Sequence, residues 1–527
     1  MQLRSVKRGR KTCCASPLLN WSTVSGRSID RVGDGPIDTY SPRSTKDDGA
    51  CLEPEPAPPG QSVGRLAVRG GGYLIGREAI GMIIRLAGVV ITVRAIGPAA
   101  YGIYSGAAAF VLFITTCAQM GAEVYLIRMP EEPDIHHYNQ VFTFLVCVSL
   151  LVTIVAVGLT FLVGPWLRPH GVVLPLQVLL LSVPVNVLWA PAQARIEREF
   201  GYRRMGFLEI GGDLVLYGTA IPLALTGAGA WSLVIGYLAW QLWLLVGSYL
   251  ISGLRPSWDW SIETSRKMTR HGLALSPANL LIRLSGLVNP LVVGMFAGAT
   301  GVGSVAFAQR LVDTVGFAKR GAYRLGVVAM SKVGSHQTTR LRYAIEEGSM
   351  LQLLALAGPF AIVGIASHWV IPVIFGPQWA IIVPLYSLLA LQTLLSASGL
   401  IQITVLISRG QNLKVAGMMA IETVVLALAA VVLVPRLGID GFGVASLISL
   451  VSLVYTDRVV RRLAAFSYRL CLPFAVALAA PVAFPLFAPP FGFLLLMPLA
   501  GLLIMGQLRR ELFRLISVVR STLRSTN

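Results

Sequence analysis

Arginine residues recur inside segments that are apolar enough to cross a membrane. The first segment runs from about Tyr73 to Gly97 and contains Arg85, and a later one contains Arg283. An ionised side chain near the centre of a bilayer costs about 2.5–3.5 kcal/mol on insertion scales, so these arginines should face a cavity or a partner rather than lipid. A guanidinium donates paired hydrogen bonds in a planar fork, which suits phosphate. The pattern therefore indicates noncovalent binding of an anion.

The arginines belong to polar stripes that follow helical spacing. The first stripe comprises Arg77, Glu78, Gly81, Arg85, Gly88 and Thr92, and the second comprises Ser276, Asn279, Arg283, Gly286 and Pro290. The next segment places Arg310, Asp313, Arg320 and Arg324 on one face. Because Glu78 and Asp313 cannot neutralise this many arginines, we expect a cationic cavity between helices. The alternative is that the arginines pair with acids, bind backbone carbonyls or extend to the membrane surface.

These stripes supply the candidate site residues. The expected headgroup-binding residues are Arg77, Arg85, Arg283, Arg310, Arg320 and Arg324. Glu78 and Asp313 are candidate sites for a coupling H⁺ or Na⁺, or else salt-bridge partners, and Glu123, Glu209 and Asp213 are weaker candidates. We expect no catalytic residue and no cofactor. We also expect no bound metal, because the acids and histidines of EEPDIHH at 131–137 lack helical ligand spacing.

Composition places these stripes in a polytopic membrane protein. Hydrophobic residues make up 55% of the 527 residues and charged residues only 13%, and the mean hydropathy is +0.69. The net charge of +19 is spread over short clusters between apolar runs, which is typical of membrane topology signals and not of a nucleic-acid-binding domain. The six cysteines show neither a disulfide framework nor metal-ligand spacing.

The elements that must position the arginines are transmembrane helices. Apolar runs long enough to cross a bilayer occur about fourteen times, which predicts an all-α fold. Basic residues gather in alternate loops, which places those loops and both termini in the cytoplasm. The expected divisions are a disordered extension at 1–66, an N-lobe at 67–260, a C-lobe at 261–465, two further crossings at 466–507 and a basic amphipathic tail at 508–527. The basic stretch 195–205 is also expected to lie on the membrane surface.

A faint internal repeat supports the two lobes. The segments VRAIGPAAYGIYSGAA at 93–108 and VGMFAGATGVGSVAFA at 293–308 share Gly97 and Gly298, and Gly102 and Gly303, at one constant offset. Repeats of this kind are typical of transporters that bind substrate between two lobes.

Several motifs together resemble a known family. RAIGPAAYGIYSGAA is similar to the LGPxxYGxY signature of oligosaccharide flippases, and ARIEREFGYRRMGFLEI, GAGAWSLVIG, LRPSWDWS, FAGATGVGSVAFAQRL and FGPQW follow in order. The chain thus resembles the polysaccharide-transporter branch of the multidrug/oligosaccharidyl-lipid/polysaccharide exporter superfamily over roughly residues 66 to 465. The resemblance implies two six-helix lobes forming a V, often with two extra helices, and alternating access. One departure is Asn289, where members often carry Asp, which argues against a coupling ion there.

The expected function is export without covalent chemistry. The resemblance implies translocation of a polyprenyl-diphosphate-linked oligosaccharide across the bacterial inner membrane, for exopolysaccharide, capsule or lipopolysaccharide assembly. The expected partners are that lipid-linked glycan, membrane lipids and a polysaccharide polymerase with its export machinery, but no nucleic acid. The alternatives are a drug exporter on the same fold, which the arginine surplus disfavours, and a glycan polymerase or ligase, which the short outer loops disfavour.

Overall fold

The opening segment forms a helix longer than its apolar run. α1 spans Val63–Gln119 in this computed structural model, which describes residues 63–127, 129, 131–164, 171–199, 201–316, 338–463, 466 and 471–486. Side chains are described from residue 81 onward, except at 202, 271–278, 338–340, 398 and 471–474. α1 is interrupted at Gly97, whose φ of 74° lies in the left-handed region that favours glycine. This break separates the first predicted crossing from the second.

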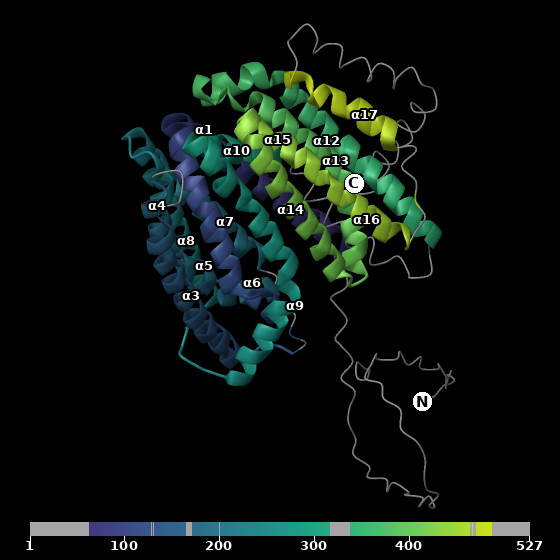
Figure 1. The fold of residues 1–527 in the computed structure, drawn as a ribbon. Coiled ribbons are helices and arrows are strands. Elements are labelled where there is room, and N and C mark those ends of the chain that lie inside the picture. Colours follow the sequence, from purple (N-terminus) through teal and green to yellow (C-terminus); the bar gives the residue numbers. More distant parts are fainter. Residues whose placement is uncertain are drawn as a thin grey trace, which may run out of the picture. The chain divides into compact units, whose positions relative to one another are not determined.

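A first group of helices follows α1 (Figure 1). They are α2 (Ala122–Ile127), α3 (Ile135–Val163), α4 (Val173–Leu180), α5 (Ser182–Leu188), α6 (Ala190–Arg198), α7 (Tyr202–Leu225) and α8 (Ala230–Ser252). The basic stretch 195–205 is the end of α6 and the beginning of α7. Arg198 donates hydrogen bonds to the carbonyls of Leu126 and Ile127 at the end of α2, at 2.9 and 3.2 Å. Arg198 is therefore bonded to protein, and the position of this stretch on the membrane surface stays a prediction.

A second group begins with the segment that carries Arg283. Its elements are α9 (Ile262–Gly286), the π-helical turn η2 (Asn289–Val293), α10 (Gly294–Val315), α12 (Thr338–Phe375), the 3₁₀ turn η3 (Pro377–Trp379), α13 (Ile382–Ser408), α14 (Asn412–Leu437), α15 (Ile439–Ile448), the 3₁₀ turn η4 (Ser449–Val451), α16 (Ser452–Arg461), α17 (Cys471–Val482) and the 3₁₀ turn η5 (Phe484–Leu486). Ser261 caps the N-terminus of α9, and its hydroxyl accepts a hydrogen bond from the amide of Thr264 at 3.2 Å. Every regular element in the described residues is a helix.

The repeated segments occupy equivalent positions in the two groups. α10 is interrupted at Gly298, with a φ of 65°, as α1 is at Gly97. α1 and α10 also pack closely against each other (Figure 1). The contact between the two groups therefore includes the two copies of the repeat.

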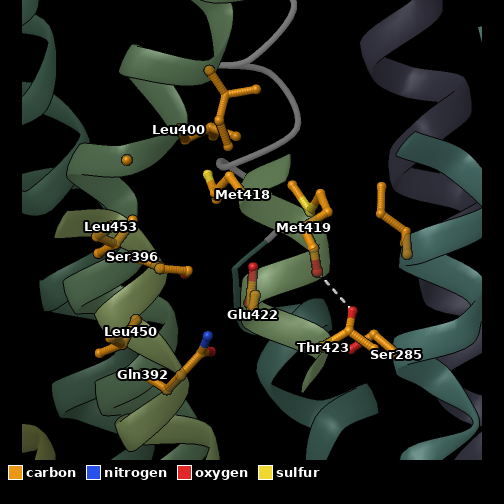
Figure 2. Close-up of a pocket in the computed structure, with 14 residues that line it drawn as sticks. Ser285, Gln392, Ser396, Leu400, Met418, Met419, Glu422, Thr423, Leu450 and Leu453 are labelled. Atoms are coloured by element: carbon orange, nitrogen blue, oxygen red, sulfur yellow. Dashed lines mark hydrogen bonds between the residues drawn. The ribbon is translucent and has the colours of Figure 1, made fainter. Parts of the chain in front are cut away.

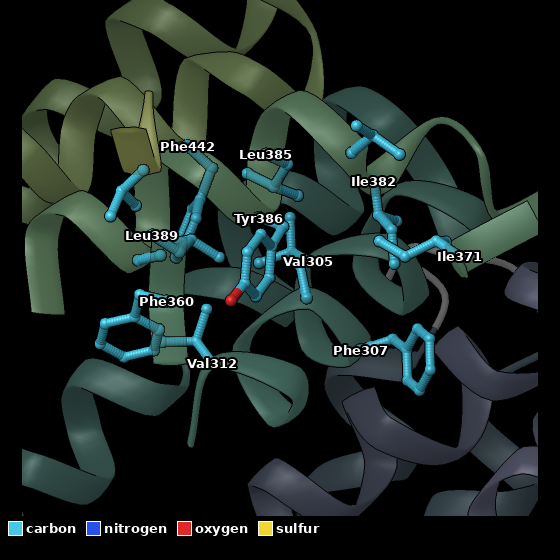
Figure 3. Close-up of a cluster of buried hydrophobic side chains, with 14 of the residues drawn as sticks. Val305, Phe307, Val312, Phe360, Ile371, Ile382, Leu385, Tyr386, Leu389 and Phe442 are labelled. Atoms are coloured by element: carbon cyan, nitrogen blue, oxygen red, sulfur yellow. The ribbon is translucent and has the colours of Figure 1, made fainter. Parts of the chain in front are cut away.

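A large apolar core joins α10, α12, α13 and α15 (Figure 3). Trp379 of η3 is completely buried, and its ring centroid lies 4.5 Å from that of Phe307 and 6.0 Å from that of Tyr101 in α1. The indole of Trp379 donates to the carbonyl of Val93 at 3.3 Å, and Arg94 donates to the carbonyl of Val373 at 2.7 Å. The end of the first crossing is thus tied to the end of α12.

The helices are suited to a membrane. Nine helices in the described residues are long and apolar enough to span one, and α13, which is bent by 45° between Ala397 and Gly399, is a tenth candidate. The all-α, polytopic fold is confirmed. The count of about fourteen crossings and the domain boundaries stay predictions, and residues 1–62 and 487–527 of the predicted extension, last crossing and tail lie outside the described residues.

Candidate functional site

Arg85 forms an ion pair with a residue of α7. Its Nη1 lies 2.8 Å from Oδ2 of Asp213. The Arg85 side chain is 38% exposed and that of Asp213 only 13%. Arg85 is therefore already bound to a carboxylate, but much of its side chain remains open to solvent.

Gly88, which follows Arg85 in the first stripe, also faces α7. The ring of Tyr217 occupies the space beside Gly88 where a Cβ would lie, so only glycine fits there. Thr92 is buried and donates to the carbonyl of Gly88 at 2.7 Å. The stripe is thus partly a helix-packing face, and Arg85 is the described residue in it that offers a charge to solvent.

Arg310 reaches the same helix from the second half of the chain. Its Nη2 donates to the hydroxyl of Tyr217 at 3.3 Å, and it interacts electrostatically with Tyr101 and Tyr104 of α1. Protein atoms surround the guanidinium, yet the residue keeps an exposed surface. Solvent therefore reaches Arg310 inside the helix bundle.

Asp213 and Tyr217 bring the two arginines together. They lie four residues apart on α7, which places them on one face about one helical turn, or roughly 5.4 Å, apart. Tyr217 interacts electrostatically with both Arg85 and Arg310. A guanidinium from α1 and another from α10 therefore meet beside one face of α7, where the Asp213 carboxylate is bonded to Arg85. We call Arg85, Asp213, Tyr217 and Arg310 the arginine cluster.

Tyr217 is the member of this cluster that the sequence argument did not select, and Asp213 was only a weaker candidate for ion coupling. The fifth apolar run, LEIGGDLVLYG, carries Glu209, Asp213 and Tyr217 at four-residue intervals. That spacing is the signal that could have found them, because it aligns three polar groups on one face of a membrane helix.

Arg283 lies on α9 and is exposed. In the described ranges it forms no ion pair or hydrogen bond, and its electrostatic interaction is with Tyr237 of α8. Arg283 thus offers a charge to solvent, but no contact joins it to the arginine cluster.

The remaining predicted residues divide into two sets. Asp313 is exposed on α10, nearly one turn after Arg310, and has an interaction partner. The side chains of Arg77 and Glu78, and the whole of Arg320 and Arg324, lie outside the described residues. The predicted roles of these four residues stay predictions.

A cavity with a mixed apolar and polar lining lies among α9, α13, α14 and α16. It is a cavity of about 230 Å³ whose polar lining includes Glu422, Gln392, Ser396 and Ser285 (Figure 2). In Figure 2 the Glu422 carboxylate is directed into this space, between α13 and α14. Thr423 on the same wall donates to the carbonyl of Met419 at 2.8 Å. Sequence reasoning did not select Glu422, although a lone acid in the apolar run after Asn412 is the kind of residue that marks function in a membrane.

Asn289 begins the π-helical turn that precedes α10. Its amide donates to the carbonyl of Val302 at 3.2 Å. Its Oδ1 is buried and has no hydrogen-bond partner among the described residues. The amide–carbonyl bond links the turn to α10, which gives Asn289 a structural role.

A further acidic group lies where α2 packs on α6. Gln193 donates to Glu123 at 3.0 Å and to Glu197 at 2.9 Å. Burial, and next the negative charge of Glu197, raises the pKa of Glu123 to about 7. Glu123 therefore changes charge near neutral pH.

Three or more metal-ligating side chains do not gather anywhere in the described part of the chain.

The sequence profile of a family described as "Polysaccharide biosynthesis protein" matches residues 91–384, which is more than half of the chain. The chain belongs to the polysaccharide biosynthesis protein family. No curated protein matches the sequence of this family member.

Solved structures show the fold that this member of the family shares. The inward closed conformation of the lipid II flippase MurJ superposes with a TM-score of 0.64 at 14% identity, over 84% of this chain and 99% of that one. An inward-facing multidrug resistance MATE family transporter of the MOP superfamily gives a TM-score of 0.57 at 16% identity, over 74% of this chain and 98% of the other. The polysaccharide biosynthesis protein thus has the fold of MOP transporters.

Proposed function

We propose that this protein is a flippase that moves a polyprenyl-diphosphate-linked oligosaccharide across the bacterial inner membrane. The observation that carries the proposal is the meeting of Arg85 and Arg310 on α7. Two guanidinium groups from different halves of the chain can bind a diphosphate from two sides, because each offers a planar set of donors to phosphate oxygens. The family and the MOP fold support a transport function in polysaccharide biosynthesis.

Binding in this mechanism depends on the exposed part of each arginine. The diphosphate would lie between Arg85 and Arg310, with Tyr101, Tyr104 and Tyr217 around it. The sugars would occupy the solvated space and the polyprenyl chain would stay in lipid. The two halves would then rock about their contact and expose the headgroup on the other side, without making or breaking a covalent bond.

We further propose that both termini lie in the cytoplasm, as the basic loops indicate. The glycan would serve exopolysaccharide, capsule or lipopolysaccharide assembly, and a polysaccharide polymerase would consume it. For a coupling ion, H⁺ or Na⁺, the carboxylate candidates are Glu78, Asp313 and now Glu422, because Glu422 lines a cavity among the apolar helices.

The decisive experiment depletes the protein and measures lipid-linked glycans by mass spectrometry. We expect one polyprenyl-diphosphate glycan to accumulate, and neither Arg85→Ala nor Arg310→Ala to relieve it although both proteins insert. Arg342→Ala is the matched control, because Arg342 pairs with Glu346 on the surface of α12 at 3.0 Å. No accumulation, or full relief by both site variants, would overturn the proposal.

The rival is a drug exporter, because a multidrug transporter shares the fold. Drug substrates of such pumps are commonly cations, which two arginines would repel. Efflux of cationic dyes in a pump-deficient strain separates the two functions. Dye efflux that depends on this protein, without glycan accumulation on depletion, would favour the rival.

A further inference from the structure

Asp213 is more deeply placed than the arginine it binds. Its side chain is 13% exposed, against 38% for Arg85, and the two are joined at 2.8 Å. An anion arriving from solvent therefore meets Arg85 first, with Asp213 behind it. Since a guanidinium carries one positive charge, the carboxylate offsets much of the attraction that the anion would feel.

The ion pair is weak enough to be exchanged. More than a third of the Arg85 side chain is open to solvent, and water there screens its attraction to Asp213. A diphosphate carries more negative charge than a carboxylate and can accept two bonds from one guanidinium. It can therefore displace Asp213 from Arg85, whereas an anion with less charge competes less well.

Asp213 has Tyr217 as a polar neighbour on its own helix. Tyr217 lies one turn further along α7 and interacts electrostatically with Asp213. Its hydroxyl accepts from Arg310 and still has its own proton to donate. A hydrogen bond from Tyr217 would lower the cost of separating the Asp213 carboxylate from Arg85.

We propose that Asp213 is a built-in competitor of the substrate's anionic headgroup, which occupies Arg85 while the carrier is empty and yields it to a diphosphate. The inference rests on the proposed function. Asp213 then makes the site selective for highly charged headgroups, because a headgroup must carry enough negative charge to displace the carboxylate from Arg85. It also favours release, since the carboxylate returns to Arg85 as the headgroup leaves.

The test measures binding of geranyl diphosphate and geranyl monophosphate to the detergent-purified full chain by titration calorimetry. Asp213→Asn should bind the diphosphate about three- to fivefold more tightly, the fold-change that corresponds to losing a competitor worth up to about 1 kcal/mol. Its preference for diphosphate over monophosphate should fall. Glycan export should also fall, because release becomes slower. Asp213→Glu keeps the carboxylate and should restore the wild-type preference.

The control is Asp457→Asn, which breaks an Asp457–Arg461 pair of 2.6 Å on α16 with the same change in net charge. It should bind both probes as wild type does. If Asp213→Asn folds, by its melting temperature, and binds the diphosphate equally or more weakly, Asp213 is a structural counterion and the inference is overturned. If Asp213→Asn does not fold, Asp213→Glu decides: an unchanged preference supports competition, and a lost preference overturns it. If wild type binds no diphosphate at all, the proposed function itself fails.

Discussion

Gly102 and Gly303 contact each other at the point where α1 and α10 cross. A Cβ placed on Gly102 would overlap the carbonyl oxygen of Ala299, and one placed on Gly303 would overlap that of Pro98. Pro98 and Ala299 are separated by the same offset as the two glycines. The contact is therefore reciprocal, as expected when two copies of a repeat are related by an approximate twofold axis. Small residues allow the two backbones to approach this closely, and in the proposed function this crossing would be the pivot about which the two halves rock.

The pivot predicts that side chains at this crossing are not tolerated. Gly303→Ala places a methyl group against backbone, which cannot move aside as a side chain can, so the helices must separate. Overpacking of this kind costs about 1–3 kcal/mol. We expect a lower melting temperature in detergent and loss of glycan export, and the same from Gly102→Ala. Gly158→Ala on α3 is the control, because nothing lies within 4 Å of its added Cβ. Equal melting temperatures for Gly303→Ala and Gly158→Ala would exclude the close contact.

Arg310 should act through the shape of its guanidinium as well as its charge. Arg310→Lys keeps the charge but loses the planar fork, so we expect it to bind geranyl diphosphate roughly tenfold or more weakly, in line with the loss of a charge-assisted bond. Tyr217→Phe removes a single hydrogen bond of 3.3 Å and should weaken binding less, by a few-fold. Titration calorimetry on the full chain distinguishes these effects. A lysine variant that binds as tightly as wild type would show that charge alone is sufficient.

The sequence predicted the helices well and the partners of the arginines poorly. Hydropathy and helical spacing depend on one segment at a time, so the crossing that holds Arg85, the break at Gly97 and its counterpart at Gly298 could all be foreseen. The pairing of Arg85 with Asp213 joins helices that are far apart in sequence. A pattern within one segment cannot show which residues of distant segments meet. Asp213 was therefore a weaker candidate than Glu78 for ion coupling.

Arg283 illustrates the same limit. The repeat made Arg85 and Arg283 equivalent positions, which suggested equivalent roles. Arg85 faces α7 and binds Asp213, whereas Arg283 lies near Tyr237 of α8. Arg310, which the sequence placed beside Asp313, is the residue of the second half that reaches the same helix as Arg85. A repeat predicts backbone equivalence, but side chains then diverge with the residues packed around them.

Trp379 should be essential for the stability of the tie between α1 and α12. The ring is completely buried and packs against Phe307 and Tyr101. Trp379→Ala leaves a large cavity and is expected to lower the free energy of unfolding by about 3–5 kcal/mol. Denaturant unfolding followed by tryptophan-independent circular dichroism measures the change. Trp258→Ala is the control, because that side chain is 68% exposed and should cost little. Similar losses for the two variants would contradict the packing of Trp379.

Glu123 should make the stability of the α2–α6 contact depend on pH. Its pKa is about 7 in the folded protein, against an ordinary value of 4.5. Between these values the folded state binds more protons than the unfolded state, so stability falls as pH rises from about 4.5 to 7 and is then constant. Glu123→Gln removes the charge and keeps an acceptor for Gln193, so it should raise the melting temperature at pH 8 and leave it nearly unchanged at pH 4.5. The exposed Glu199, bound to Arg195 at 3.2 Å, is the matched site for comparison, and Glu199→Gln should not produce this gain. If the melting temperatures of Glu123→Gln and wild type differ by the same amount from pH 4.5 to pH 8, the prediction is wrong. Glu123 would then already be ionised at pH 5, bound to a cation rather than to Gln193.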